Sequence, residues 1–312
     1  MRAVFFGTPS FAATILKYLL EKGVEVVAVV TKPDKPQGRY LQPRFSPVKE
    51  LALERALPLY QPPKASAPEF ASVLKELKAD LFIVAAYAEI LKENLLEMPL
   101  KKCINVHASI LPKYRGAAPV QRAIMEGEKE TGVTIMQMAK ELDAGGILSI
   151  VKTAITDQMT AGELMEKLAI LGAVALYEVI EKLDKGTVAV QMQDPAQVTY
   201  AKKISIEDTK ISWNRPAFQV HNQIRGVTPH PGAWCLVEIK GVSKRLLIKK
   251  GAIESQYAGK PGEILSKNGS ELVIGCSQGA FRILELQIEG KKKMASDEFL
   301  RGIQLANLNF II

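Results

Sequence analysis

The stretch Leu81-Phe82-Ile83-Val84-Ala85-Ala86 is a continuous apolar run with no alternation of polar and apolar side chains. A strand of this kind is buried on both faces, which is typical of a parallel sheet covered by helices on each side. Comparable runs occupy 2–6, 24–30 and 104–107, and helical patterns separate them at 10–21, 46–56 and 68–77. The alternation predicts an α/β fold in which a mostly parallel sheet carries helices on both faces.

The same alternation continues to about residue 187. Two further strands are expected at 133–138 and 147–152. Thr160 and Glu163 have the spacing of a capping box, in which each side chain bonds the backbone N–H of the other residue, and apolar residues at helical spacing follow as far as Val179. At the first helix, Ser10 is expected to act as the N-cap.

The pattern changes in the last third of the chain. Residues 190–206 lack periodicity and are interpreted as a linker between a domain at 1–189 and a second domain at 207–312. Short strand-like runs punctuated by glycines predict a smaller β-barrel in the second domain. These runs lie at 233–239, 245–249, 263–265, 272–275 and 280–288, and a closing helix is expected at 296–307.

Composition excludes several classes of protein. The 312 residues are 47% hydrophobic and 24% charged, which are globular proportions, so disorder and coiled coil are excluded as the main architecture. The three cysteines, Cys103, Cys235 and Cys276, form no C-x-x-C pair, which argues against a disulfide framework or a cysteine zinc site and favours a cytoplasmic location. Because no run approaches ~18 apolar residues, no membrane span is expected.

The net charge of +8 is unevenly distributed. Residues 207–312 hold 15 Lys and Arg against 10 Asp and Glu, whereas residues 1–206 hold 26 against 23. A basic second domain is consistent with an anionic partner such as nucleic acid. A charge that serves only solubility is the alternative.

The first loop excludes two common ligands of α/β proteins. A dinucleotide fingerprint requires G-x-G-x-x-G, but the loop reads Gly7-Thr8-Pro9-Ser10-Phe11-Ala12. Pro9 stands in place of the second glycine, and the lysine of a P-loop is missing. Binding of NAD or ATP at this turn is therefore not expected.

A polar cluster interrupts the apolar strand at 104–107. Asn105 and His107 alternate, so both side chains lie on one face near the carboxyl end of a strand, where open α/β sheets commonly bind ligands. Two donors on one face suit an oxyanion that develops from a carbonyl. Asp143, in Leu142-Asp143-Ala144-Gly145-Gly146, could orient the imidazole and move a proton. The structural alternatives are a hydrogen-bonded core histidine and a simple turn.

These residues resemble a known family. Asn105-x-His107-x-Ser109-Ile110-Leu111-Pro112, with Asp143-x-Gly145 downstream, is similar to the signature of the folate-dependent formyltransferases. Other segments resemble the members of that family that act on methionyl-tRNA. They are Gly7-Thr8-Pro9, Ala86-Tyr87 and the segments 33–39, 115–122, 130–136 and 290–294. The resemblance implies a Rossmann-like first domain and an OB-like β-barrel.

The resemblance also implies an activity. A formyl group would pass from 10-formyltetrahydrofolate to the α-amino group of methionine on initiator tRNA, with no metal, no membrane and no stable protein partner. One rival is an N-formyltransferase that acts on an amino-sugar nucleotide or a ribonucleotide. Another is a non-catalytic RNA-binding protein on the same fold.

Three sets of site residues follow from the resemblance. The catalytic set is Asn105, His107 and Asp143. The folate set is Tyr87, Ala88, Glu89, Ile90, Leu91, Ser109, Ile110, Leu111, Pro112 and Leu142. The tRNA set is Arg39, Arg44, Lys244, Arg245, Lys249, Lys250, Lys291, Lys292 and Lys293.

The chain departs from the family in two places. Ile110 stands where the family has Leu, an apolar exchange of little consequence. The basic loop G-R-G-K-K of bacterial members is Gly38-Arg39-Tyr40-Leu41-Gln42 here. Arg39 is retained, both lysines are missing, and Arg44 is a partial replacement for their charge. The tRNA contacts of this loop are therefore expected to differ.

Overall fold

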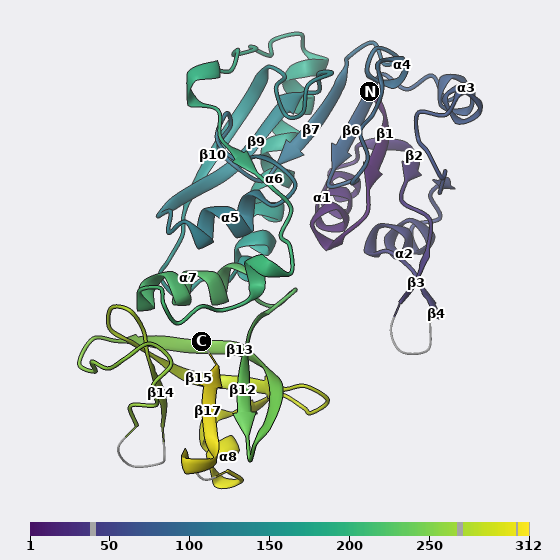
Figure 1. Ribbon diagram of the computed structural model, residues 1–312. Coiled ribbons are helices and arrows are strands. Elements are labelled where there is room, and N and C mark those ends of the chain that lie inside the picture. Colours follow the sequence, from purple (N-terminus) through teal and green to yellow (C-terminus); the bar gives the residue numbers. More distant parts are fainter. Residues whose placement is uncertain (38–41, 267–270, 304, 312) are drawn as a thin grey trace. The chain divides into compact units, whose positions relative to one another are not determined.

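Two units divide the chain, and each has its own sheet. The computed structural model describes residues 1–37, 42–266, 271–303 and 305–311 (Figure 1). The N-terminal unit consists of Met1–Pro119, Glu130–Ala154 and Met165–Ala201. The C-terminal unit consists of Val120–Lys129, Ile155–Leu164 and Lys202–Ile312.

The N-terminal unit is built on a seven-stranded sheet with the order β10-β9-β7-β6-β1-β2-β5. Five strands are parallel and two at one edge are joined by antiparallel pairing, which confirms the predicted α/β class. The parallel strands are β1 (Arg2–Gly7), β2 (Glu25–Val30), β5 (Leu59–Tyr60), β6 (Leu81–Ala85) and β7 (Cys103–His107). At that edge, β9 (Glu130–Gln137) pairs antiparallel with β7 and with β10 (Ile147–Ala154).

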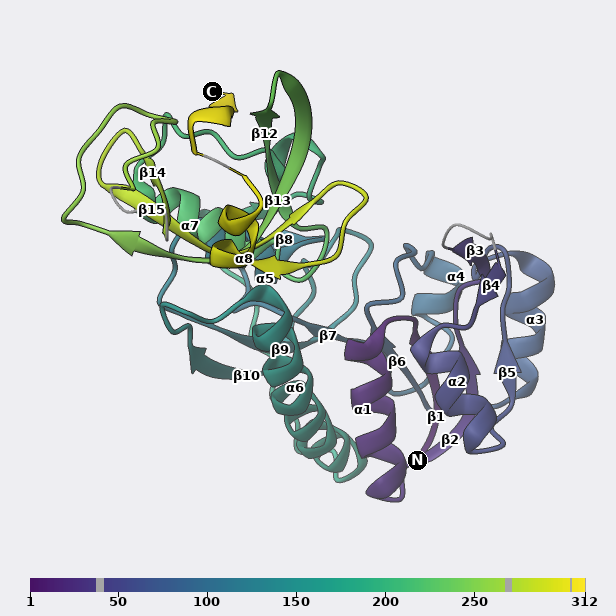
Figure 2. The same ribbon diagram turned by 90° about the horizontal axis from the view of Figure 1, so that it is seen from below.

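Helices cover both faces of this sheet, as the apolar runs require. All five residues of β6 are buried. On one face, Phe6 and Phe82 pack with residues of α3 (Pro68–Glu76) and α4 (Glu93–Leu96). On the other, α1 (Ser10–Glu21) and α6 (Ala161–Asp184) lie side by side, joined by an edge-on contact between Tyr18 and Tyr177 (Figure 2).

Local capping explains where several helices begin. Ser46 Oγ accepts a hydrogen bond from Lys49 N and so caps α2 (Pro47–Glu54). The capping box before α6 is confirmed, because Thr160 N donates to Glu163 Oε2 at 2.8 Å and Glu163 N donates to Thr160 Oγ1 at 3.3 Å. The prediction for Ser10 is wrong. Pro9 occupies the cap position of α1 and Ser10 is the first helical residue, so no side chain caps that helix.

The C-terminal unit contains an antiparallel sheet with the order β14-β15-β13-β12-β17, which curves as a half-barrel (Figure 1). Its strands are β12 (Ala233–Ile239), β13 (Val242–Glu254), β14 (Leu272–Gly275), β15 (Ala280–Ile288), β16 (Met294–Ala295) and β17 (Leu308–Ile311). The helix α7 (Ala217–Gly226) packs against it, and Trp213, Phe281 and Phe310 occupy its core. The register of β13 against β15 shifts near Lys250, and Gly251 allows Phe281 to lie against the backbone, since a Cβ there would meet the ring at 2.2 Å.

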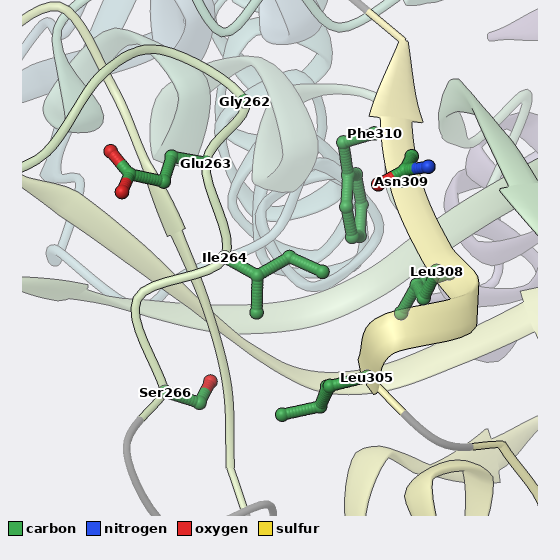
Figure 3. Close-up of a pocket in the computed structure, with 8 residues that line it drawn as sticks. All are labelled: Gly262, Glu263, Ile264, Ser266, Leu305, Leu308, Asn309 and Phe310. Atoms are coloured by element: carbon green, nitrogen blue, oxygen red, sulfur yellow. The ribbon is translucent and has the colours of Figure 1, made fainter.

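Two predictions for this unit are wrong. Residues 263–265 form a single bridge from Ile264 to Ile274 and not a strand. The closing helix, α8 (Ser296–Arg301), stops early and β17 follows, in which Leu308 and Phe310 are buried and their neighbours are exposed. That alternation of period two belongs to a strand. A cavity of about 460 Å³ separates residues 262–266 from residues 305–310, and the side chains of Ile264 and Phe310 face it (Figure 3).

The remaining elements are short, and none of them was predicted from the sequence. They are β3 (Lys35–Gln37), β4 (Gln42–Arg44), β8 (Arg115–Gly116), α5 (Pro119–Met125) and β11 (Tyr200–Ala201), with 3₁₀ turns at Pro195–Gln197, Glu207–Thr209 and Leu305–Asn307. Within the described ranges, no helix combines the length and the apolar character that crossing a membrane would need.

One ion pair of the C-terminal unit makes its stability depend on pH. Arg122 donates to both carboxylate oxygens of Asp208, at 2.9 and 2.6 Å, and the backbone N–H of Ser205 adds a third hydrogen bond. The hydrogen bonds from Arg122 are the main reason why the pKa of Asp208 is lowered to about 2. A carboxyl with a lowered pKa in the folded state stabilises the fold above its unfolded pKa, and that contribution is lost as the pH falls towards 2.

We expect Asp208→Asn to reduce the free energy of unfolding by roughly 1–2 kcal/mol at pH 7. As the pH falls from about 4 to about 2 the difference from the wild type should shrink, because the carboxyl takes up a proton first in the unfolded chain and then in the folded one. Urea unfolding at pH 7 and at pH 3 measures both quantities. Asp297→Asn, which removes an exposed pair with Arg301, is the matched control and should cost less than about 0.5 kcal/mol. Equal losses for the two variants at pH 7 would contradict this account.

Candidate active site

The strand order of the N-terminal unit determines where a site can form. β1 lies between β2 and β6, so the chain leaves β1 towards one side of the sheet and later returns on the other side. Ligands of open α/β sheets bind outside the carboxyl ends of the strands at such a point. The loops after β1, β6 and β7 all begin at the carboxyl ends of these parallel strands, and the predicted polar residues lie at the end of β7.

Asn105 and His107 come from the end of β7, on the same face. Asn105 is half-buried, and its side chain makes no hydrogen bond with the described residues. The side chain of His107 is 7% exposed, and its Nε2 lies 3.0 Å from the carbonyl oxygen of Tyr114. Because a carbonyl only accepts, this hydrogen bond requires the proton on Nε2. Nδ1 is then the ring nitrogen that remains for other partners.

Asp143 reaches His107 from the loop between β9 and β10. Its Oδ2 accepts a hydrogen bond from Gly116 N at 2.8 Å and lies 3.7 Å from His107 Nδ1, beyond hydrogen-bond distance. Among the described residues, none donates to its Oδ1. The backbone of Asp143 is left-handed, with φ of 51°, and Gly145 is pressed so closely to the chain that a Cβ would meet Gln137 O at 1.8 Å. Both expectations for Asp143 are therefore met. The segment forms the turn expected from its glycines, and its carboxylate faces the imidazole of His107.

The three side chains supply the hydrogen-bond donors and the proton acceptor that a reaction at a carbonyl group needs. The amide of Asn105 and a protonated Nδ1 of His107 supply two donors for a developing oxyanion. Oδ1 of Asp143 supplies a proton acceptor. Within the described part of the chain, no three His, Cys, Asp or Glu side chains are grouped so that they could hold a metal ion.

The residues predicted to contact folate divide into exposed and buried side chains. Ile90 and Leu142 are 73% and 55% exposed, large apolar side chains on the loops after β6 and β9. Leu91 and Leu111 are buried in the core. Tyr87 is also buried, its ring packs edge-on against Phe6, and burial raises the pKa of its hydroxyl. Only the backbone of these buried residues is available to a ligand.

The turn Ser109–Pro112 is held from β9. Thr134 Oγ1 donates to Ser109 O at 2.7 Å and accepts from Leu111 N at 3.1 Å, so one hydroxyl determines the shape of the turn. Thr134 was not predicted as a site residue, because it lies inside an apolar strand and the resemblance of the segment 130–136 to the family does not single it out. On the other side of the site, Glu89 is an ion-pair partner of Lys32 and accepts a hydrogen bond from Ala65 N, so its carboxylate is already engaged.

Most of the predicted tRNA residues lie on strand β13 or shortly after strand β15. Arg39 is outside the described residues, and Arg44 is the last residue of β4. Lys244, Arg245, Lys249 and Lys250 belong to β13, and Lys291, Lys292 and Lys293 follow β15, which pairs with β13.

Two observations show how these cations interact. Partial burial, and to a smaller extent the nearby charge of Lys293, lower the pKa of Lys249, so these two cations lie near each other. Lys293 also pairs with Glu285 at 2.8 Å, and the guanidinium of Arg245 stacks on Trp234 at 4.1 Å. The side chains of Lys291 and Lys292 are exposed.

Gln193 is a site residue that was not predicted from the sequence. It donates hydrogen bonds to the carbonyl oxygens of Asp143 and Gly145, each at 2.8 Å. The aperiodic segment around it offered no signal beyond its polar composition. Its place at the site depends on pairing between distant segments, because β11 lies against β8.

Comparison with known proteins places the chain in a family. The formyl transferase model matches residues 1–180, and the model of the formyl transferase C-terminal domain matches residues 203–304. A methionyl-tRNA formyltransferase of Protochlamydia amoebophila is 49% identical over 312 residues, covering 100% of this chain and 98% of the relative. One from Chlamydia caviae is 44% identical over 305 residues, covering 97% of this chain and 95% of the relative.

A solved structure shares the fold. WlaRD, described as a sugar 3N-formyl transferase in the presence of dTDP and 5-N-formyl-THF, superposes with a TM-score of 0.67 at 21% identity, covering 94% of this chain and 99% of that one. The matches to both family models and to full-length relatives agree with one another. The chain belongs to the formyl transferase family, among the methionyl-tRNA formyltransferases.

Proposed function

We propose that this enzyme transfers a formyl group from 10-formyltetrahydrofolate to the α-amino group of methionine on initiator tRNA. The observation that carries the proposal is the pair formed by His107 and Asp143. The amide of Asn105 lies on the same face of β7 as His107, near the carboxyl end of that strand. Relatives named methionyl-tRNA formyltransferase, similar along the whole chain, support the acceptor. A solved neighbour with a formylated folate supports the donor.

The residues in the loops at the carboxyl end of the sheet fit a folate. A folate ring system needs apolar contact and backbone hydrogen bonds, and the site offers the exposed side chains of Ile90 and Leu142 beside the loops 86–91 and 109–112. When bound, 10-formyltetrahydrofolate supplies the formyl carbon. We assign its binding to Tyr87–Leu91, Ser109–Pro112 and Leu142, with backbone contacts from the buried members of this set.

The side chains of the site have distinct tasks in the transfer. Asn105 donates its amide hydrogen bond to the oxygen on which negative charge develops, and His107 donates from Nδ1 to the same oxygen. Tyr114 O keeps the imidazole in place through Nε2, 3.0 Å away. Asp143 balances the charge of a protonated His107, and its Oδ1 accepts the proton that the attacking amine loses. The transfer would be complete when the bond between the formyl carbon and the folate nitrogen breaks and that nitrogen takes up the proton held by Asp143, which releases tetrahydrofolate. Gly116 N holds the other carboxylate oxygen in position throughout.

We assign tRNA binding to the basic residues of the C-terminal unit and to the loop that carries Arg39 and Arg44. The cations lie on β13 or directly after β15, its paired neighbour, and a group of cations on neighbouring segments suits a phosphate backbone. In this proposal, residues 1–189 form the catalytic domain, residues 190–206 link the two domains, and residues 207–312 form the tRNA-binding domain. The enzyme would act in the cytoplasm, where initiator tRNA is used.

The test is an acceptor assay with the purified protein. Formyl transfer from 10-formyltetrahydrofolate is measured with initiator methionyl-tRNA, with elongator methionyl-tRNA, with glycinamide ribonucleotide and with a dTDP-amino sugar. Transfer to initiator methionyl-tRNA in preference to the other acceptors is expected. Preference for either small acceptor would replace the proposal with the corresponding N-formyltransferase, and no transfer to any acceptor would favour a non-catalytic role.

Asn105→Ala and His107→Ala should each lower turnover by about 10²-fold or more, which is the scale for loss of an oxyanion donor. Folate binding, measured by calorimetry with 5-formyltetrahydrofolate, should change by less than about 3-fold. Asn214→Ala and His230→Ala, which change exposed residues of the C-terminal unit, are the matched controls. Near-normal turnover of either site variant would remove that residue from the mechanism.

Asp143→Asn should lower turnover by about 10²-fold or more, because the amide still accepts a hydrogen bond from Gly116 N but no longer takes up a proton. The loop should remain intact, so the KM values for both substrates should stay within about 3-fold of the wild type. Steady-state kinetics between pH 6 and pH 9 provide the measurement. Turnover equal to that of the wild type across this range would mean that Asp143 serves only the turn.

Reversal of Lys291 and Lys292 to Glu should weaken binding of methionyl-tRNA and flatten the plot of log K against log salt. The slope should change by roughly 0.7–0.9 for each phosphate that is no longer neutralised. Lys293 is left unchanged because its charge is paired with Glu285. The matched control reverses Lys75 and Lys167, two exposed lysines of α3 and α6 that change the net charge equally. If both double variants alter the slope to the same extent, the effect comes from net charge and not from this surface.

A further inference from the structure

We propose that Gln193 is a positioning residue for catalysis, which holds Asp143 at its working position opposite His107. The inference rests on the proposed function, because it assigns Asp143 a part in the chemistry. Gln193 lies outside the signature motifs, in a segment that would otherwise be only a connection. Its hydrogen bonds explain how a carboxylate on a glycine-rich loop can keep a defined place.

Both polar atoms of the Gln193 side chain make hydrogen bonds. Its amide nitrogen donates to Asp143 O and Gly145 O, each at 2.8 Å, and its Oε1 accepts from Arg115 Nε at 3.1 Å and Nη2 at 2.7 Å. The orientation of the carboxamide follows from these partners, because the two carbonyls can only accept and the guanidinium can only donate. A buried charged donor on the oxygen also polarises the amide and strengthens its two N–H groups as donors.

Three consecutive residues hold both members of the His–Asp pair. Tyr114 O accepts from His107 Nε2, the side chain of Arg115 binds Gln193, and Gly116 N donates to Asp143 Oδ2. Asp143 is therefore held twice from residues 115–116, by its carboxylate directly and by its backbone through Gln193. Such a closed ring of hydrogen bonds fixes the direction of the carboxylate as well as its distance from the imidazole.

The backbone around Asp143 needs this support. Asp143 has φ of 51° and Tyr114 has φ of 60°. Both lie in the left-handed region, which residues other than glycine rarely occupy. Backbone of this kind persists only where its surroundings over-determine it. The segment that carries Gln193 is itself anchored to two of these three residues, since Tyr114 N donates to Thr199 Oγ1 and Arg115 N donates to Thr199 O, each at 2.9 Å.

Gln193→Glu separates positioning from simple anchoring. The carboxylate keeps its attraction to Arg115 but offers no N–H to the carbonyls of Asp143 and Gly145, so the segment stays attached while the loop loses its support. We expect kcat for formylation of methionyl-tRNA to fall by about 10- to 100-fold, because a displacement of about 1 Å can cost that much. KM for both substrates should stay within about 3-fold. Gln197→Leu, in which a glutamine of the same segment loses its bond to Asp194, is the matched control and should leave kcat unchanged.

A double-mutant cycle with Asp143→Asn shows whether Gln193 acts through Asp143. If it does, Gln193→Glu should lower kcat by less than about 2-fold in the Asp143→Asn background, since coupled residues do not contribute additively. An equal fall in both backgrounds, an unchanged kcat in the wild-type background, or a change in KM alone would overturn the proposal. Gln193→Asn, which keeps the amide on a shorter side chain, replaces Gln193→Glu in the cycle if that variant does not fold.

Wild-type activity separates this inference from the proposed function. If the wild type forms no formylmethionyl-tRNA, the function is wrong whatever Gln193 does. If the wild type is active and the cycle is additive, only the role of Gln193 is wrong.

Discussion

Parallel pairing of β6 with β1 on one side and β7 on the other is the constraint on which the N-terminal unit depends. It requires three apolar strands to be buried together, with Phe6, Val84 and Asn105 in register across them. Because parallel strands end at one edge, the same pairing brings the loops after Gly7, Ala85 and His107 together. In this row Phe6 and Val84 are apolar and belong to the core, and Asn105 is the first polar residue. The site therefore lies directly beside the core.

Strained backbone is concentrated around that edge. Eight residues other than glycine have positive φ in the described part of the chain, and four of them, Ala86, Ala88, Tyr114 and Asp143, lie in loops of the site. Each costs of the order of 1–3 kcal/mol, which the surrounding structure must offset. Gln193 and Gly116 hold the loop of Asp143 by hydrogen bonds, and Thr134 holds the turn Ser109–Pro112. The loop of Ala86 and Ala88 is held through Glu89, which pairs with Lys32 and accepts a hydrogen bond from Ala65 N. The loops of the site are thus held by hydrogen bonds from other segments, whereas Asn105 and His107 are positioned by strand β7.

The C-terminal unit meets a different requirement. Its sheet is antiparallel and covers one core around Trp213 and Phe281, so its outer surface is free to carry charge. The long strand β13 bends at Gly251, where Phe281 takes the space of the missing side chain. Cations on β13 and after β15 come together through strand pairing alone, although about forty residues separate Lys249 from Lys291.

Patterns in the amino-acid sequence were enough to predict the α/β class and most strands and helices, and they pointed to Asn105, His107 and Asp143. Burial leaves a periodic or continuous apolar pattern, and polar residues that interrupt such a pattern are conspicuous. The predictions failed where the signal was short or tertiary: Pro9 in place of Ser10 as a cap, and β17 in place of the end of a helix.

The place of Gln193, Arg115 and Thr134 at the site became visible only in three dimensions, since their partners are distant in sequence. Gln193 lies about fifty residues from the loop that it holds, and nothing in its own segment distinguishes it from the polar residues beside it. A hydrogen bond between loops depends on where two backbones meet, and no local pattern of residues encodes that meeting point.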